Sequence, residues 1–319
     1  MKTQEISSPM LDTFDRLPTP DQFYTRVLQV LLSVWRAMTS SRKVAVGSAI
    51  VGIFIVVGLF GPMLMRYAPE ATSKLFIAPP SAIHWLGTTV VGQDIFSQLI
   101  NGTRTSVFWG LGTGVLVTLL SMVVGLVGGY FGGWVDDVLT LLTNVSLVLP
   151  ALPLAIVLAA YFPRGPLTIS LVIVFTNWAW QARVLRAQTL STRSREFVTA
   201  ARASGERTWR IIFYEIFPNE IGIVVAGFVS TTIYVVLTWA ALEFLGLGDG
   251  TIPSWGSILY WAQQAGALGG GLWWWFVPPG VCIALLGAGL SLINFGIDEI
   301  ADPRLRQDTN PKKVRKAAA

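Results

Sequence analysis

The side chains that most often carry catalysis are scarce in this sequence. It has one histidine, His84, and one cysteine, Cys282, far apart along the chain. Nucleophilic or metal-assisted catalysis needs a cluster of histidine, cysteine or carboxylate side chains, and no such cluster is visible. A single cysteine also excludes an intramolecular disulfide. We therefore expect no catalytic residue and no cofactor or metal site in this chain, and we interpret His84 as a loop residue beside Trp85.

The lysines exclude ATP binding through a P-loop. That motif needs Gly-Lys followed by Ser or Thr, and every lysine here follows a residue other than glycine. Any ATP hydrolysis coupled to this chain would be carried out by a partner. An enzyme embedded in the membrane would need polar catalytic residues at membrane depth, and the candidates are Ser121, Thr143, Asn144 and Ser146. Hydrogen bonding between helices explains these four residues more simply.

The carboxylates are placed poorly for ion coupling, which uses ionisable residues at membrane depth. Asp136 and Asp137 lie where a helix is expected to begin. A helix N-cap, favoured by the helix dipole, is a simpler interpretation of these residues than a proton-binding site. Glu243 lies near the end of an apolar segment, at best at its mouth. This pattern favours a conduit opened and closed by something else over a secondary transporter, although a stand-alone facilitator for an uncharged substrate also fits.

Seven arginines lie between Gln181 and Asn219. Helix-forming residues fill 196–204, and Gly205 is placed to end that helix. A second helix is predicted from Thr208 to Phe217, where Pro218-Asn219 would stop it. Because glutamates alternate with the arginines, the surface has mixed charge and suits a protein partner better than the phosphates of nucleic acid. We predict a compact knob that docks another protein.

The elements that position these residues are long apolar segments. The chain is 53% hydrophobic and 13% charged, against about 25% charged in soluble domains. The first segment has 22 uncharged residues, which as a helix would rise about 33 Å and cross a hydrocarbon core of about 30 Å. We predict an all-α polytopic membrane protein with six transmembrane helices: Val44 to Met65, Thr105 to Tyr130, Val138 to Phe162, Pro166 to Gln181, Ile221 to Leu242 and Trp273 to Ile297. The short fourth helix is expected to continue past Arg183.

The basic residues orient these helices, because lysine and arginine gather on the cytoplasmic side. Of the 23, 19 fall before the first span, between the fourth and fifth, and after the sixth. Both chain ends and the loop 189–219 are therefore expected in the cytoplasm, with loops 66–104 and 246–272 outside. The expected organisation is an N-terminal segment (1–43), a six-helix membrane domain (44–297) and a basic tail (298–319). The net charge of +5 then reflects topology.

The segment before the first span does not resemble a secretory signal, because about forty mixed polar residues precede the first apolar block. Apolar residues recur at helical spacing from Asp21 to Met38, with arginines among them. We predict an amphipathic helix lying along the inner membrane surface. A solvated helix packed on protein is the alternative.

Glycines recur four residues apart in the second span. The pairs are Gly110 with Gly114, Gly128 with Gly132, and Gly129 with Gly133. Such spacing allows helix backbones to approach closely. We expect tight packing of this span against its neighbours.

The arginine-rich loop resembles the cytoplasmic signature of ATP-binding-cassette importer permeases. That signature is Glu-Ala-Ala, three residues, Gly, nine residues, and Ile-x-Leu-Pro. Here it is Thr199-Ala200-Ala201, Gly205 and Glu215-Ile-Phe-Pro218. The Ala-Ala, Gly and Pro keep their spacing, and Thr199 replaces the leading glutamate.

The resemblance narrows to the oligopeptide and dipeptide permease group and covers most of the chain. It includes Trp85-Leu-Gly-Thr88, Gly92-Gln-Asp94 with Ser97, Gly102 to Ser106, Gly128 to Gly133 with Asp137, Ala182-Arg183 with Arg186, Pro253-Ser-Trp-Gly256 and Asp302-Pro-Arg-Leu-Arg306. This chain has Thr89 where aspartate is usual, and Gln93 and Gln98 where arginines are usual.

The resemblance implies a permease subunit that pairs with a homologous second permease and forms half of a pathway for peptides. Two cytoplasmic ATPase subunits, which bind ATP and magnesium, and an extracytoplasmic binding protein would complete the transporter in the membrane lipid, with no nucleic acid involved. The knob would be the coupling helix docked on an ATPase. Its expected contact residues are Glu196, Thr199, Ala200, Ala201, Arg202, Gly205, Glu206 and Pro218.

The loop 246–272 is the expected face for the binding protein, through Ser254, Trp255, Gly256 and Trp261. Tryptophans here also fit an aromatic belt at the lipid headgroups. Stacking against a sugar or a peptide side chain is the alternative. With 13 tryptophans, an oligosaccharide or another solute stays open beside a peptide as the substrate.

Overall fold

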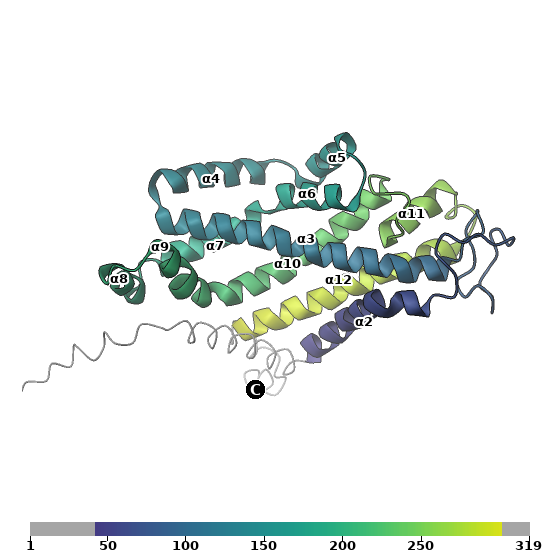
Figure 1. Ribbon diagram of the computed structural model, residues 1–319, viewed down its shortest axis with the longest axis horizontal. Helices are drawn as coiled ribbons and strands as arrows, with labels where there is room; N and C mark the ends of the chain where they lie inside the picture. Colours follow the sequence, from purple (N-terminus) through teal and green to yellow (C-terminus); the bar gives the residue numbers. More distant parts are fainter. Residues whose placement is uncertain (1–41, 302–319) are drawn as a thin grey trace, which may run out of the picture.

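The computed structural model describes residues 42–301, where the regular elements are all helical. Figure 1 shows an elongated molecule in which long helices run beside one another along its length. The short helix α8 (Glu196–Ala203) lies at one end, and α11 (Trp255–Gln264) lies toward the other. We call these the α8 end and the α11 end. The predicted helix from Asp21 to Met38 and the motif from Asp302 to Arg306 fall outside the described residues.

Four helices of the described chain are long and apolar enough to cross a membrane. They are Arg42–Leu64, Ile95–Phe131, Thr208–Phe244 and Trp273–Ile297. A helix suits this setting because it bonds every backbone polar group internally where water is absent. These four correspond to the first, second, fifth and sixth predicted spans, and the second and fifth begin earlier than expected.

The third predicted span is bent. It forms α4 (Gly133–Val148) and α5 (Ala151–Tyr161), which meet at an angle of 90°. Pro150 lies at the break, and Leu149 before it is extended at ψ 132°. Proline has no N–H to donate and pushes the preceding residue out of the helical conformation. The expectation of a single helix from Val138 to Phe162 is therefore wrong.

The fourth predicted span is also divided, although more gently. The apolar helix α6 (Pro166–Asn177) is followed by α7 (Ala179–Thr192), and Trp178 between them keeps helical angles of φ −70° and ψ −29°. The chain therefore stays helical past Arg183, as expected. By length and composition, residues 42–301 contain four membrane-spanning helices, or five if the bent pair counts as one, where the sequence predicted six.

Helix α3 (Ile95–Phe131) lies at the centre of the bundle and contacts α2 (Arg42–Leu64), α6, α7 and α10 (Phe217–Phe244). Its glycines make these approaches close. A Cβ added at Gly110 would lie 2.8 Å from Val236 of α10, and one at Gly125 would lie 2.7 Å from the Cβ of Leu185 in α7. The expected close packing of the second span is thus present at Gly110.

Gly132 and Gly133, the last two glycines of the predicted pairs, form a turn instead of a helix contact. Gly132 and Gly133 have φ of 67° and 54°, and they form the turn from α3 into α4. Residues with a side chain rarely adopt this left-handed conformation. The spacing of Gly128 with Gly132 therefore reflects a chain reversal as much as helix packing.

Candidate functional site

The knob at the α8 end is an amphipathic helix packed on the bundle. Val198 and Ala201 of α8 are buried with Leu126 and Tyr130 of α3, and with the isoleucines of the following helix, Ile211, Ile212 and Ile216. Their spacing of three residues places Val198 and Ala201 on one face. The other predicted contact residues of α8 are exposed: Glu196, Thr199, Ala200 and Arg202. One face thus anchors α8 while the other is open.

A glycine turn ends α8 as the sequence predicted. Gly205 has φ of 77°. Its N–H donates to the carbonyl of Arg202 at 3.0 Å, and the N–H of Glu206 donates to the carbonyl of Ala201 at 3.2 Å. This pair of bonds is the Schellman motif, which satisfies the last carbonyls of a helix. The motif fixes the angle at which the chain leaves α8.

Charged side chains on both sides of the Gly205 turn contact neighbouring residues. Arg202 lies over the ring of Tyr130 in α3, with its guanidinium carbon 4.8 Å from the ring centroid. Glu206 forms an ion pair with Arg210, four residues later, with its carboxylate oxygen 3.1 Å from Nε. Each contact joins one predicted docking residue to a neighbour within the chain.

The helix after the turn does not stop at Pro218. It starts as α9 (Thr208–Arg210), widens into the π-helical segment η2 (Ile211–Ile216) and continues as α10. A proline inside a regular helix removes one hydrogen bond and clashes with the carbonyl four residues before. A π-helical turn changes the backbone register, so it can accommodate the missing N–H. The prediction that Pro218-Asn219 stops the helix is therefore wrong.

A buried carboxylate that the sequence pattern did not indicate lies beside this segment. Glu220 of α10 has an exposed fraction of 0%, and it accepts a hydrogen bond from the hydroxyl of Thr189 in α7 at 2.9 Å. Thr189 in turn packs on Gly129 of α3. The available signal was a single glutamate at the edge of a long apolar run. Glu220 thus joins α10 to α7 close to the knob.

An ion pair joins α4 to α7. Asp136 accepts two hydrogen bonds from the guanidinium of Arg186, through Nε and, at 2.7 Å, through Nη2. Nearby, Arg193 Nη1 donates to the carbonyl of Gly129 at 3.0 Å. The N-cap of α4 is Gly132, and Asp136 lies in the first turn. The N-cap interpretation of Asp136 is thus wrong, although its place near the positive end of the helix stands.

At the α11 end, three of the four predicted surface residues are buried. Ser254 caps α11, and its hydroxyl donates to the carboxylate of Glu243 at 2.5 Å. Trp255 is 1% exposed, and its indole N–H donates to Thr103 at 3.2 Å. A Cβ added at Gly256 would lie 2.6 Å from the Cβ of Glu243. These residues hold α11 against α3 and α10 instead of presenting a surface.

Trp261 keeps its expected exposure at this end, whereas Glu243 does not. Of the predicted set, Trp261 alone is exposed, at 49%. Glu243 was expected at the mouth of a span, but it is 5% exposed and bonded to Ser254. The physical reason is the short connection between α10 and α11, which folds back so that the start of α11 covers the end of α10.

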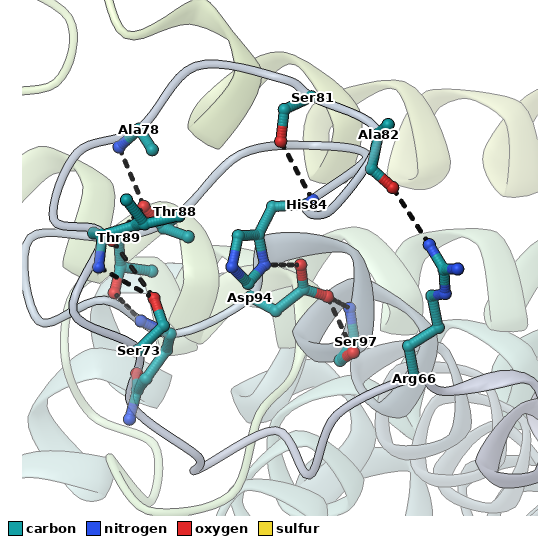
Figure 2. Close-up of polar contacts among 12 residues, drawn as sticks. Arg66, Ser73, Ala78, Ser81, Ala82, His84, Thr88, Thr89, Asp94 and Ser97 are labelled. Atoms are coloured by element: carbon teal, nitrogen blue, oxygen red, sulfur yellow. Dashed lines mark hydrogen bonds and ion pairs between the residues drawn. The ribbon is translucent and has the colours of Figure 1, made fainter.

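The segment between α2 and α3 folds around His84 (Figure 2). His84 is 3% exposed, and its Nδ1 lies 2.8 Å from Oδ1 of Asp94. Asp94 is the N-cap of α3, and its other oxygen accepts from the N–H and the hydroxyl of Ser97. The hydroxyl of Thr88 accepts from the N–H of Ala78 at 2.8 Å. His84 is therefore a loop residue, as expected, but a buried one that positions the start of α3.

Metal-ligating side chains do not gather in the described part of the chain. Residues 42–301 contain no group of three or more histidine, cysteine and carboxylate side chains that could hold an ion. The polar groups at the α8 end instead form hydrogen bonds and ion pairs between helices.

A family comparison matches the region that contains the knob. Residues 118–307 match the family described as "Binding-protein-dependent transport system inner membrane component". This range includes α8, its glycine turn and α11. It covers more than half of the chain.

Curated relatives match nearly the whole chain. The oligopeptide transport system permease protein OppC of Bacillus subtilis is 32% identical over 283 residues, which is 86% of this chain and 92% of the relative. The dipeptide transport system permease protein DppC of Alkalihalophilus pseudofirmus is 30% identical over 313 residues, covering 96% and 100%. The glutathione transport system permease protein GsiD of Pectobacterium atrosepticum is 28% identical over 276 residues, covering 85% and 90%.

Proposed function

Because this chain belongs to the family of binding-protein-dependent transport system inner membrane components, we propose that it is the permease subunit of a peptide importer driven by partner ATPases. Its apolar helices make it a multi-pass inner-membrane protein. Its family is one of transporter subunits with no catalytic role of their own. The work of ATP hydrolysis therefore falls to other chains.

Peptides are the substrate class that the relatives favour. The three relatives described above are named for the transport of oligopeptides, dipeptides and glutathione. All three cargoes contain peptide bonds. Peptides are thus favoured over the oligosaccharide that the sequence had left open.

The proposal includes an assembly and an orientation. This chain pairs with a second, homologous permease, and the α8 end faces two ATPases in the cytoplasm. Six passes through the membrane follow if α4 with α5, and α6 with α7, each count as one span. The distribution of basic residues supports this orientation, and an extracytoplasmic binding protein then docks at the α11 end.

The observation that carries the proposal is the two-faced packing of α8. Its buried face is joined to α3 and to the long helix from Thr208 to Phe244, which runs toward the α11 end. Its open face offers a partner the small side chains of Thr199 and Ala200. A push on α8 therefore reaches a helix that spans the molecule, and rigid-body movement of packed helices is a common way to switch access.

Uptake into proteoliposomes tests this function. The chain is reconstituted with its second permease and its ATPases, and radiolabelled dipeptide or oligopeptide is supplied with the binding protein. We expect uptake only with ATP and with every subunit present. Flux through this chain alone under an ion gradient would contradict the proposal and support a stand-alone transporter.

A further inference from the structure

A cavity of about 640 Å³ lies at the α11 end. Its walls come from two regions far apart in the sequence, residues 69–98, which include the start of α3, and residues 250–275, which include α11. Cavities that bind small molecules have volumes of about 300 to 1,000 Å³. The proposed docking of ATPases at the α8 end does not involve this cavity.

The cavity combines apolar walls with amide side chains. Val90, Val91, Ile258 and Trp261 supply apolar surface. The side chains of Gln93, Gln98 and Gln264 also line it. Each glutamine amide has both a donor and an acceptor, as a peptide group does.

Several of these polar groups have unused hydrogen-bonding capacity. Gln98 donates to the amide oxygen of Gln93 at 2.8 Å, which leaves the Gln93 amide N–H groups and the Gln98 oxygen without a partner among residues 42–301. Trp275, which lines the cavity, is 2% exposed, and its indole N–H has no acceptor within the described chain. A buried donor of this kind gains from a ligand that brings an acceptor.

The charge at the cavity is negative. Glu70 lines it, whereas none of its lining residues is lysine or arginine. Asp249 directly precedes the lining residues Gly250 and Thr251, and hydrogen bonds from the hydroxyl and the N–H of Thr251 lower the pKa of the Asp249 carboxyl. These carboxylates attract a cation and disfavour an anionic ligand.

We propose that this cavity binds the amino-terminal end of a short peptide, with the ammonium group toward Glu70 and backbone groups against the Gln93 and Gln98 amides. The inference rests on the proposed function, because it assigns a binding site for the cargo to this subunit itself. Trp261 would cover an apolar side chain of that peptide. A neutral sugar could use the amides and the indole, but it gains nothing from the carboxylates.

Unmodified transporter gives the first test. The assembled permease pair and ATPases are placed in lipid nanodiscs without binding protein or nucleotide. Binding of Ala-Leu-Ala, of N-acetyl-Ala-Leu-Ala and of maltose is titrated by saturation-transfer NMR. A lost charge-assisted hydrogen bond should weaken binding of the acetylated peptide about tenfold. Equal affinity for both peptides, tighter binding of maltose, or no peptide binding would overturn the proposal.

Variants then locate the site. Trp261→Ala and Glu70→Gln should each weaken Ala-Leu-Ala binding about tenfold, and Glu70→Gln should leave acetylated peptide unchanged. Trp273→Ala is the matched control, because Trp273 is similarly exposed at the same end and does not line the cavity. Unchanged binding in both test variants, or equal loss in the control, would place the peptide elsewhere.

Uptake of Ala-Leu-Ala by the complete transporter distinguishes failure of the proposed peptide site from failure of the proposed importer function. Peptide uptake together with failed binding tests would refute the cavity assignment alone. Failure to take up any peptide, when the binding protein is present and the ATPases are active, would refute the proposed function as well.

Discussion

Gly205 and Ala201 show how single residues give α8 its position. Gly205 ends the helix with φ of 77° and an N–H bonded to the carbonyl of Arg202, and Ala201 is 4% exposed against the bundle. A proline at 205 can provide neither the positive φ nor the N–H. An arginine at 201 would bring a charge into an apolar cluster.

We expect Gly205→Pro and Ala201→Arg to leave the chain in the membrane but to abolish peptide uptake and the stimulation of ATP hydrolysis by substrate. Ala203→Arg is the matched control for the second change, because Ala203 is exposed on the same helix. Uptake and ATPase stimulation in proteoliposomes provide the measurements. Normal uptake by both variants would refute the docking role of α8.

The two ion pairs near the α8 end should differ in energy. Asp136 and Arg186 are 14% and 28% exposed, whereas Glu206 and Arg210 are 17% and 39% exposed. Exposed pairs one helical turn apart contribute about 0.3 to 0.5 kcal/mol. Less exposed pairs that act as a unit couple by about 0.5 to 3 kcal/mol.

A double-mutant cycle checks this difference, with Asp136→Asn and Arg186→Gln for one pair, and Glu206→Gln and Arg210→Gln for the other. We expect the larger coupling between Asp136 and Arg186, measured from the free energy of unfolding in detergent. Equal coupling in the two cycles would show that the α4 to α7 contact contributes no more than a surface pair.

At the scale of elements, glycines decide how closely α3 meets its neighbours. A Cβ at Gly125 would lie 2.7 Å from Leu185 and 2.8 Å from the carbonyl of Ala182, both in α7. At Gly112 of the same helix, no atom lies within 4 Å of an added Cβ. Substitutions at Gly125 and Gly112 therefore distinguish the effect of close helix packing from the effect of helix propensity.

We expect Gly125→Ala to destabilise the protein by about 1 to 3 kcal/mol, because the backbone of α7 must move away. Gly112→Ala should be neutral or stabilising by up to about 1 kcal/mol, since alanine favours helices over glycine. Thermal unfolding in detergent measures both changes. Similar loss in the two variants would contradict the close contact of α3 with α7.

For the whole molecule, orientation in the membrane is the property that would link the two ends to their proposed partners. From the distribution of the basic residues we expect the α8 end in the cytoplasm and the α11 end outside. The exposed residues Ser194, near α8, and Ile83, in the loop after α2, mark these two ends.

Single cysteines test the orientation in a Cys282→Ala background. We expect a membrane-impermeant maleimide to label Ile83→Cys in intact cells. Ser194→Cys should react only after the cells are permeabilised. The opposite labelling pattern would reverse the topology and remove the basis for docking ATPases on α8.

The sequence by itself determined the all-helical membrane class, the short helix α8 with its glycine turn, and the family. Composition, helical period and turn chemistry are local properties, so they can be seen without coordinates. The relatives then confirmed the family. The substrate class needed those relatives, because no single motif in the chain encodes it.

Only the tertiary structure decided which residues meet. It showed the bend at Pro150, the helix continuing through Pro218, and the burial of Trp255 and Glu243. It also paired Asp136 with Arg186 and brought Glu70 together with Trp261 at one cavity. Burial and pairing depend on neighbours distant in sequence, whose positions follow from how the helices pack rather than from local pattern.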